Sequence, residues 1–445
     1  MGYVKQLCFI LPLMLVKTAW GGDEHAGHRS ILSGIDDTPG RSYIDRTVPP
    51  ALAAIKKDPS LIGYQAVYSR VISVCRVGCD YTEPTSAYNA AVLQAHMMYG
   101  NNHVEVKIGD GSYNLNHNFV TSDAATSRVH IVGNQDDPTR VVLNFTNTKG
   151  KNLTAFLATS GGIFGLITGV TITQPADGSG AMASTDLAGR HLWNPQSYGA
   201  GVGAYGGGVV VLGKSIVIRN FYYSIVADNN GFIDVPNGNG VFLHDAGDVN
   251  AMARGGGTIV CLKCHASGAS DYTDPKAAIL GSSFDAERGG TLYIDGSTSE
   301  KTLEAGVLAL SGGAAWAQNM TISKPLGRGP GALISGFSSV NLGGTKIFGY
   351  YIGVNAQYGF VDVSHCTIDG SGATGIVADG GRVTGSSVTI MHSKQFGIQA
   401  IHQGNVVLFD TFARMLANGT NFAPSEAGVQ RVSGSRYGAS SIDVQ

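Results

Sequence analysis

Residues 340–410 repeat at a nearly constant interval, and this interval constrains the fold more than any other feature of the sequence. Gly353, Gly375 and Gly397 lie 22 residues apart, and each is followed by Val or Ile. Other apolar positions keep the same spacing to within one residue: Ile347, Ile368 and Ile390, and Val340, Val361, Val383 and Val406. Such a period, built from strand-forming residues between turn residues, is typical of a solenoid whose coils must stack to bury their apolar side. It predicts an all-β fold, a parallel β-helix of about 12 coils.

The composition agrees with a solenoid and excludes some functions. Glycine makes up 63 of 445 residues, and charged residues make up 14%. Glycine allows the sharp turns with positive φ that each coil needs. The net charge of −2 argues against a nucleic-acid binder and against a basic protein of the membrane surface.

The first 21 residues have the pattern of a signal peptide. Lys5 precedes the apolar stretch Leu7–Val16, and Ala19, Trp20 and Gly21 follow as a cleavage region. We expect a secreted or periplasmic protein; a buried N-terminal strand or a virion-attachment peptide is the alternative. The apolar stretch is too short to span a bilayer, and no other run approaches the required length of about 20 residues, so no membrane span is expected.

The remaining chain divides by pattern into three parts. Residues 22–85 form an irregular lead-in, residues 86–410 form the β-helix with a capping helix, and residues 411–445 form a C-terminal cap or tail. The capping helix is expected over Ala87–Tyr99, with Ala90, Leu93, His96 and Met97 on one side. A helix across the open end of a solenoid would cover exposed strand edges.

Five cysteines remain after the predicted signal peptide. Export would permit bridges between Cys75 and Cys79 and between Cys261 and Cys264, leaving Cys366 unpaired and buried. A C-x-x-C motif followed by His265 also occurs in zinc, redox and haem-attachment sites. Because this motif overlaps a strand-like run that starts at Thr258, a structural pair is preferred.

A family resemblance appears in the first coils. The segment from Val104 to Tyr113 reads V-x-V-x-I-G-D-G-x-Y, and H-I-V-G-N and D-P-T-x-V-V-L follow between His130 and Leu143. This order resembles the opening of pectin-lyase-like right-handed parallel β-helix proteins. It is most similar to phage tailspikes and related secreted polysaccharide-active proteins. The resemblance implies a right-handed helix and leaves a homotrimer open, although no coiled-coil heptads are present.

The resemblance does not assign a catalytic residue. The N-T-D, D-D, G-H-G and R-I-K elements of polygalacturonases are not arranged here as in that family. The W-I-D-H and R-x-P-x-x-R elements of pectate lyases are missing, and so are the Q-A-V-A-L and D-F-I-F-G elements of pectin methylesterases. Any site must therefore be argued from the residues themselves.

Two insertions, at residues 176–207 and 229–257, place the expected site in the middle third of the chain, because insertions in a solenoid become loops on one face. Sugar rings stack on aromatic side chains. We therefore expect Trp193, Tyr198, Tyr205 and His244 to bind substrate. Tyr222 and Tyr223 are further candidates, unless they are ordinary strand residues.

Two reaction types fit the polar residues of this region. Hydrolysis needs a pair of carboxyl groups, for which Asp245, Asp248, Asp285 and Glu287 are the candidates. The alternative for these residues is a set of solvated loop acids. β-Elimination on a uronic acid needs a cation and a base, and the candidates are Arg254, Lys263, His265 and Arg288. Arg254 and Arg288 occupy matching turn positions, so both are alternatively structural.

The sequence as a whole favours an exported polysaccharide-degrading enzyme, a lyase or a glycoside hydrolase, that binds an extended extracellular or capsular polymer in a groove on the middle coils. A non-catalytic glycan-binding adhesin or tail-fibre module is the first alternative, and a carbohydrate epimerase is the second. No cofactor is required. Ca²⁺ stays open for a groove rich in Asp, although no metal-binding spacing is present.

Overall fold

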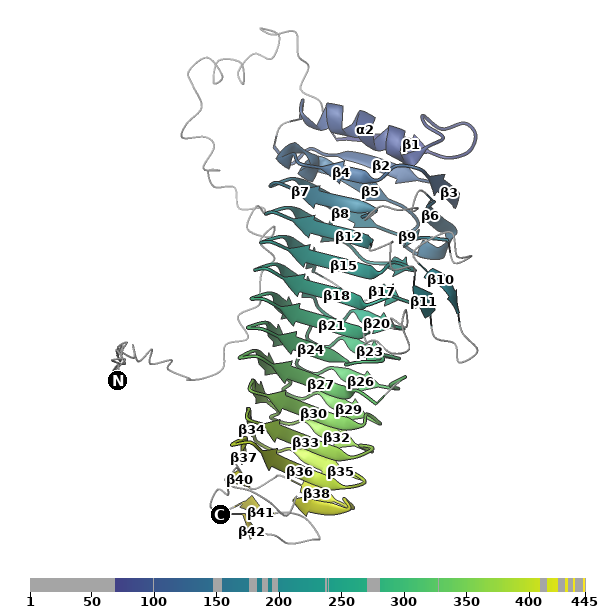
Figure 1. Cartoon of the computed structure of the whole chain (residues 1–445). Helices are drawn as coiled ribbons and strands as arrows, with labels where there is room; N and C mark the ends of the chain where they lie inside the picture. Colours follow the sequence, from purple (N-terminus) through teal and green to yellow (C-terminus); the bar gives the residue numbers. More distant parts are fainter. Residues whose placement is uncertain are drawn as a thin grey trace, which may run out of the picture. The chain divides into compact units, whose positions relative to one another are not determined.

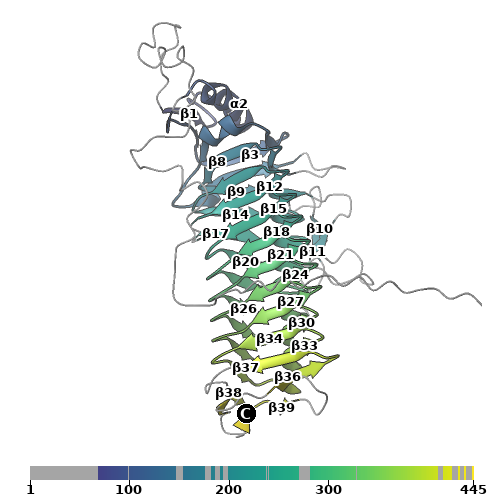
Figure 2. The same cartoon turned by 90° about the vertical axis from the view of Figure 1, so that its left-hand side faces the viewer.

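The computed structural model describes residues 69–98, 100–146, 154–175, 182–185, 191–193, 199–236, 238, 240–269, 281–326, 328–408, 414–422, 429–430, 435–436 and 443–444. The predicted signal peptide and most of the lead-in lie outside these ranges. In the described residues the chain repeats one path through three parallel sheets, which we call sheets 1, 2 and 3 (Figures 1 and 2).

Sheet 1 contains 14 strands among the described residues: β1 Arg70–Val74, β2 Val104–Ile108, β5 Val129–Val132, β8 Ile163–Thr168, β13 Val209–Leu212, β16 Phe232–Val235, β19 Thr258–Cys261, β22 Thr291–Tyr293, β25 Ala314–Trp316, β28 Ser339–Asn341, β31 Phe360–Asp362, β34 Arg382–Gly385, β37 Asn405–Leu408 and β40 Val429–Gln430.

Sheet 2 has 12 strands within the same ranges: β3 Gly111–Leu115, β6 Val141–Phe145, β9 Val170–Thr173, β14 Ile216–Arg219, β17 Val241–His244, β20 His265–Ser267, β23 Thr298–Glu300, β26 Thr321–Ser323, β29 Lys346–Phe348, β32 Thr367–Asp369, β35 Thr389–Met391 and β38 Arg414–Leu416.

Sheet 3 also has 12 described strands: β4 Phe119–Thr121, β7 Phe156–Thr159, β12 Ala200–Tyr205, β15 Tyr223–Asp228, β18 Val249–Arg254, β21 Ser282–Glu287, β24 Val307–Leu310, β27 Pro330–Ser335, β30 Ile352–Gln357, β33 Thr374–Asp379, β36 Phe396–Ile401 and β39 Thr420–Phe422. Outside the three sheets lie helix α2 Pro84–Ala95, the 3₁₀ turns η4 Ala124–Arg128 and η5 Pro138–Arg140, and two antiparallel pairs, β10 Met182–Thr185 with β11 His191–Trp193 and β41 Ser435–Arg436 with β42 Asp443–Val444.

The predicted coil period is confirmed residue by residue. Val340 pairs with Val361, Val361 with Val383, and Val383 with Val406. Ile347, Ile368 and Ile390 stack in the same way in sheet 2. Residues 21 to 23 apart in the sequence therefore lie one strand apart in space. This arrangement is the parallel β-helix of about 12 coils that the spacing predicted.

The core runs along the inside of the coils and is filled by matching side chains from successive turns. In sheet 3, Ala204, Ala227, Ala253, Ala286 and Ala309 lie in register and are fully buried. Larger rings fill the first coils, where Phe119 and Phe156 stack with their ring centroids 4.5 Å apart. Since every coil buries its apolar side against the next, the stack is stabilised mainly by contacts between neighbours.

Helix α2 covers the first coils, as predicted, but the side that carries Leu93 and Met97 does not face the core. Leu93 is 70% exposed and Met97 is 41% exposed. The buried face consists of Ala87, Tyr88, Ala91 and Ala95, together with the first two helical residues. The Tyr88 ring packs against Phe119, with the centroids 5.3 Å apart. Small residues are needed here because the helix lies close to the flat end of the coil.

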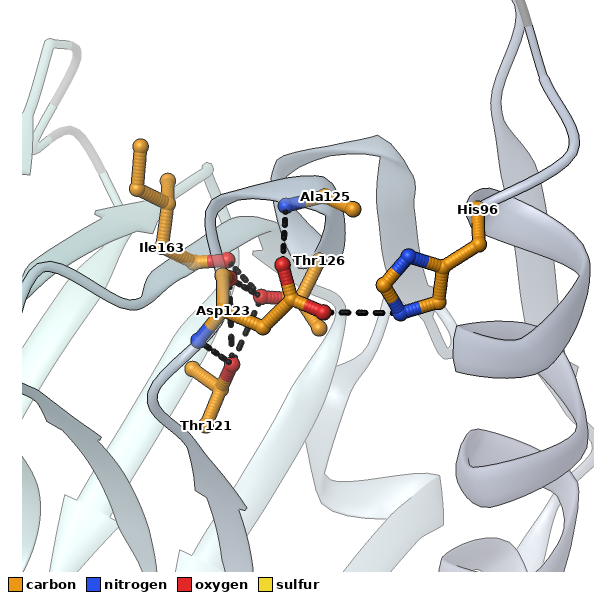
Figure 3. A network of polar contacts seen from close by, with 6 residues as sticks. All are labelled: His96, Thr121, Asp123, Ala125, Thr126 and Ile163. Atoms are coloured by element: carbon orange, nitrogen blue, oxygen red, sulfur yellow. Dashed lines mark hydrogen bonds and ion pairs between the residues drawn. The ribbon is translucent and has the colours of Figure 1, made fainter.

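A polar network ties the end of this helix to the loop below it (Figure 3). Nε2 of His96 lies 2.7 Å from a carboxylate oxygen of Asp123. The other carboxylate oxygen of Asp123 accepts a hydrogen bond of 2.8 Å from the Ala125 amide and so caps η4. The helix is thereby held by polar contacts at its last turn as well as by its apolar face.

The cysteine predictions are confirmed in the structure. Cys75 is bonded to Cys79, Cys261 is bonded to Cys264, and Cys366 is unpaired and buried. Cys261 and Cys264 are both fully buried at the turn between β19 and β20. The C-x-x-C motif therefore forms a structural bridge here, as expected for a strand-overlapping pair.

Candidate functional site

The candidate site lies on the outward face of sheet 3, over strands β15 to β24, which follow one another in Figures 1 and 2. Successive residues of a strand point to opposite faces. Phe284 and Ala286 of β21 are fully buried core residues, so Asp285 and Glu287 point outward. Asp285 pairs in register with Met252 and Leu308. Glu287 pairs with Arg254 and Leu310.

We call this region the acidic face and define it by Asp228, Asp248, Arg254, Asp285, Glu287 and Glu304. Asp248 directly precedes β18, and Glu304 lies three residues before β24. The two loops therefore bring one carboxyl group to the coil on each side of β21. The Ser282 amide donates to the Asp248 carbonyl at 3.0 Å, and the Ser282 hydroxyl lies 3.4 Å from Oε2 of Glu304. Ser282 thus links the three coils.

Asp285 is the most unusual group on this face. The residue is only 4% exposed, and its Oδ1 has no hydrogen-bond partner among the described residues. Burial raises the pKa of this carboxyl well above its usual value, and the nearby Glu287, Asp248 and Glu304 raise it further, while Arg254 opposes them. The surroundings of Asp285 therefore favour its neutral form over its carboxylate.

Arg254 is the cation of the acidic face. Its Nε donates a hydrogen bond of 2.9 Å to Oδ2 of Asp228, and the two residues occupy the same register position on neighbouring strands. This contact is a partly buried ion pair, with 31% and 22% of the two side chains exposed. The guanidinium is therefore held by Asp228 on one neighbouring strand, while Glu287 occupies the same register position on the other.

A cavity of about 530 Å³ opens beside Arg254. It is lined by Thr154, Leu157, Thr159, Ala200, Tyr205, Tyr223 and Arg254. Tyr205 and Tyr223 pack against a small apolar cluster of Ala200, Val226, Val249 and Met252. Burial raises the pKa of both tyrosines, and the Asp248 carboxylate, which accepts a hydrogen bond from Tyr223, raises that of Tyr223 further. The cavity thus combines two aromatic rings with a cation.

Four of the eight predicted catalytic residues meet on the acidic face: Asp248, Arg254, Asp285 and Glu287. Among the predicted sugar-binding residues, Tyr205 lines the adjoining cavity. Tyr222 is 5% exposed, whereas Tyr223 lines the cavity, so the two tyrosines have different environments.

Asp245, His244 and His265 lie elsewhere, at sheet 2. Nδ1 of His244 is 2.6 Å from the Ser267 hydroxyl, and the Asp245 amide donates to the Ser267 carbonyl at 3.0 Å. His265 contacts the Thr298 hydroxyl through Nδ1. Burial lowers the pKa of both histidines. These residues form a separate group, with the histidine ring centroids 5.4 Å apart.

Lys263 and Arg288 are corner residues. Both have a left-handed backbone, with φ of 59° and 51°. Lys263 lies between β19 of sheet 1 and β20 of sheet 2, and Arg288 lies between β21 of sheet 3 and β22 of sheet 1. Their amides donate to the carbonyls of Asp295 and Leu310 on the next coil. The structural alternative considered for Arg288 fits this position.

The side chains of the other two predicted sugar-binding residues are not described in the structure. Tyr198 is outside the described residues, and only the backbone of Trp193, within β11, is described. Their role in substrate binding stays a prediction.

Two residues of the acidic face were missed by sequence reasoning, Asp228 and Glu304. Asp228 ends β15 just as Arg254 ends β18, one coil later, so the coil period would have paired them. Glu304 precedes a sheet 3 strand as Asp248 does, but its loop has a different length, which hides the correspondence.

Within the part of the chain that the structure describes, no group of three or more His, Cys, Asp or Glu side chains has an arrangement that could hold a metal ion. A search of the same residues finds no helix long and apolar enough to cross a membrane. A role for Ca²⁺ in other parts of the chain stays a prediction.

Among the comparisons with known proteins, only solved structures match this chain. No family model and no curated protein sequence matches the chain. The catalytic domain of a GH87 α-1,3-glucanase in complex with nigerose aligns with a TM-score of 0.51 and 12% identity, over 82% of this chain and 69% of that chain. The Agl-KA catalytic domain gives the same four values. The A-module of mannuronan C-5 epimerase AlgE4 from Azotobacter vinelandii covers 83% of this chain and 98% of its own, with 13% identity and a TM-score of 0.39.

At these identities, the likeness of the two glucanase domains extends to the fold. Together with three parallel sheets in a common register, it supports what the coil period and the pectin-lyase-like opening predicted. The chain is a right-handed parallel β-helix protein.

Proposed function

We propose that the protein is an exported polysaccharide-degrading enzyme, a glycoside hydrolase that cleaves an extended polymer across the acidic face. The observation that carries the proposal is Asp285, a buried carboxyl group with a raised pKa beside a second outward carboxyl group, Glu287. Pairs of carboxyl groups in different environments perform glycoside hydrolysis. The two disulfides support export, because such bonds persist in oxidising compartments.

Asp285 is the proposed general acid. Burial and the neighbouring carboxyl groups disfavour its charged form and raise its pKa, as a general acid requires. A protonated carboxyl can donate its proton to the glycosidic oxygen as the bond breaks. The sugar that leaves then departs as an alcohol instead of an alkoxide.

Glu287 is the proposed general base. It lies two residues beyond Asp285 on the same face of β21, which corresponds to about 6.6 Å along the strand. Carboxyl groups about 6.5–9.5 Å apart leave room for a water molecule and are typical of inverting enzymes, whereas retaining enzymes have them about 5–5.5 Å apart. The figure of about 6.6 Å is the backbone spacing of the two residues. We propose that their carboxyl groups keep a similar separation, so that the reaction is a single displacement by water with inversion at the anomeric carbon.

The cavity of about 530 Å³ beside Arg254 is the proposed sugar-binding subsite. Tyr205 and Tyr223 offer ring surface for a sugar to stack on, and Arg254 offers hydrogen-bond donors. Because Arg254 is held by Asp228, its orientation is set before a sugar binds. Preorganised contacts of this kind reduce the entropy lost on binding.

The lyase alternative has less support. Its four candidate residues are spread over sheet 3, sheet 2 and two corners, so a base and a cation do not meet at one point. The tyrosines nearest to Arg254 have raised pKa values, which disfavours a phenolate base. The epimerase alternative, which uses the same chemistry, meets the same difficulty.

One observation favours the non-catalytic alternative. Asp285 is only 4% exposed, whereas an acid catalyst must reach its substrate. A glycan-binding module would use the tyrosine-lined cavity without needing access to Asp285. The two functions differ in a simple readout, because only the enzyme changes its ligand.

The test is incubation of the full chain with a panel of extracellular polysaccharides. A hydrolase releases reducing ends without new ultraviolet absorbance, whereas a lyase produces unsaturated ends that absorb. NMR spectra of the first products should show the inverted anomer. Retention would remove Glu287 from the role of base, and binding without any cleavage would support the module instead.

A further inference from the structure

The acidic face holds more carboxyl groups than hydrolysis needs. Two carboxyl groups suffice for the reaction, and Asp228 is bound to Arg254. Glu304 and Asp248 are additional, and they lie on the coils on either side of Asp285. Both groups act on Asp285 through space, as Glu287 does, and the opposing cation is Arg254. The surplus charge therefore lies along the axis that an extended polymer would follow.

Two carboxyl groups of this face are held where a negative charge is destabilised. Burial raises the pKa of Glu304 as well as that of Asp285. The side chain of Glu304 accepts a long hydrogen bond of 3.4 Å from the Ser282 hydroxyl and a second one from the Gly281 backbone amide. Oδ1 of Asp285 has no hydrogen-bond partner in the described part of the chain. Such groups gain most from a ligand that brings positive charge and hydrogen-bond donors.

The three classes of polysaccharide would interact differently with this face. A polymer of uronic acids would bring carboxylates next to carboxylates, which is unfavourable at short range. A neutral polymer would displace water from the carboxyl groups without replacing its charge stabilisation. An amino-sugar polymer would place ammonium groups against them and form charge-assisted hydrogen bonds.

We propose that the substrate is a cationic polysaccharide of hexosamine units with free amines, whose ammonium groups bind Glu304 and Asp248 on the coils flanking Asp285. The inference rests on the proposed hydrolase function and adds the class of substrate to it. Glu304 is then a specificity-determining residue, because a bound ammonium group adds the positive charge that its hydrogen bonds from Ser282 and Gly281 do not supply.

The experiment measures binding to polymers that differ only in charge. De-N-acetylated poly-glucosamine and poly-galactosamine are compared with the same polymers after N-acetylation and with polygalacturonate. The Asp285→Asn variant of the full chain is used, because asparagine resembles the neutral acid in shape and prevents cleavage during the measurement. We expect one free-amine polymer to bind at least about tenfold tighter than its acetylated form, with an affinity that falls as NaCl is added.

Matched variants assign the preference to Glu304. Glu304→Gln should weaken binding of the free-amine polymer about tenfold, because it removes about one charge-assisted hydrogen bond. Binding of the acetylated polymer should not change. Glu304→Asp retains the charge and should retain the preference. Glu300→Gln is the control, because Glu300 ends β23 in sheet 2 and pairs with Lys324 at 3.0 Å.

The outcomes separate this inference from the proposed function. If neutral or anionic polymers are hydrolysed while free-amine polymers bind no better than acetylated ones, the substrate class is wrong and the hydrolase stands. If no polymer of any class is bound or cleaved, both proposals are wrong. A preference that survives Glu304→Gln unchanged would also overturn the assignment to Glu304.

Discussion

Acidic residues behave differently in the middle coils and in the C-terminal coils of the same solenoid. Asp379 ends β33 and lies 2.7 Å from Nδ1 of His402, one coil further on. Asp369 of β32 has the same relation to His392, also at 2.7 Å. In the middle coils, Glu287 ends β21 at the equivalent place in sheet 3, and its register partner Leu310 corresponds to Ile401. The residue that follows Leu310 is Ser311, where the C-terminal coils have His402.

The difference shows that the backbone alone does not create a site. The coils before and after β27 share the same sheets and register. In the C-terminal coils an acid on the surface is matched by a histidine on its neighbour. In the middle coils several acidic side chains surround Asp285, which is itself buried. Such an arrangement reduces stability and is expected only where it serves a function.

The largest expected effect is a loss of activity on replacing Asp285, which we compare with the same substitution at an acid of the C-terminal coils. Asp285→Asn should lower kcat/KM for the cleaved polymer by about 10²–10⁴-fold, because it removes the proposed general acid. Asp379→Asn, in the C-terminal coils, should leave kcat/KM within about twofold. The measurement is initial rates of reducing-end release for the two purified variants. Equal effects of the two substitutions would remove the contrast between the regions.

A second prediction concerns the regular coils, where we expect packing rather than charge to determine the effect of a substitution on stability. A Cβ added at Gly353 would lie 2.3 Å from Cγ2 of Ile368 and 2.5 Å from the Gly375 carbonyl oxygen. Gly353→Ala should therefore lower the free energy of unfolding by about 1–3 kcal/mol, the usual cost of overpacking a core. Denaturant unfolding followed by circular dichroism measures it.

Gly343→Ala is the control for this packing prediction. The nearest atom to its added Cβ is Oδ1 of the Asn341 side chain at 3.2 Å, and a side-chain end can move aside. We expect a change within about 0.5 kcal/mol. If Gly343→Ala lost as much stability as Gly353→Ala, the loss at Gly353 could not be attributed to close packing between coils.

A third prediction uses the pH dependence of stability. Because the folded protein keeps Asp285 protonated above its usual pKa of 3.8, the unfolded chain loses this proton first as the pH rises. The contribution of Asp285 to stability is present at low pH and is lost as the pH rises from about 4 towards its raised pKa, at up to about 1.4 kcal/mol per pH unit. Asp285→Asn should remove this loss.

The measurement for this third prediction is the difference in unfolding free energy between the two proteins as a function of pH. The variant should be as stable as the natural chain at the lowest pH and increasingly more stable above about pH 4. A difference that does not vary with pH would mean that the charged form of Asp285 is tolerated in the fold.

The smallest expected effect belongs to the surface pairs of the C-terminal coils. The His402 side chain is 68% exposed and that of Asp379 is 26% exposed, so solvent screens their interaction. His402→Ala should change the unfolding free energy by less than about 1 kcal/mol. Thermal unfolding at two salt concentrations measures it. A larger loss would mean that paired surface acids contribute to the stability of this region more than their exposure implies.

Much of the fold could be predicted because stacked coils repeat the same apolar positions. Val361 lies between Val340 and Val383 in the sheet because each is one coil period from the next in the sequence. The buried face of α2 could not be read from the pattern, because it is made of Ala87, Ala91 and Ala95 rather than of large apolar residues. Hydrophobicity alone favoured Leu93, which is exposed.

The candidate site could be predicted in part for a related reason. Asp248, Arg254, Asp285 and Glu287 all belong to sheet 3 strands or directly precede them, so one coil spacing brings them together. Lys263 and His265 are close to Arg254 in sequence but follow the turn into another part of the coil. The period says which coil a residue belongs to, whereas the sheet depends on the turns within the coil, which have no fixed length.

The small-residue face of α2 has a consequence for self-association. A β-helix ends in a row of unpaired strand edges over an open core, and a second molecule could add its own coils there and begin a fibre. In this chain α2 lies over the first coils, and Tyr88 fills the space above Phe119 and Phe164. The helix therefore hinders head-to-tail growth of fibrils at this end, and removing it would expose strand edges that could act as a template.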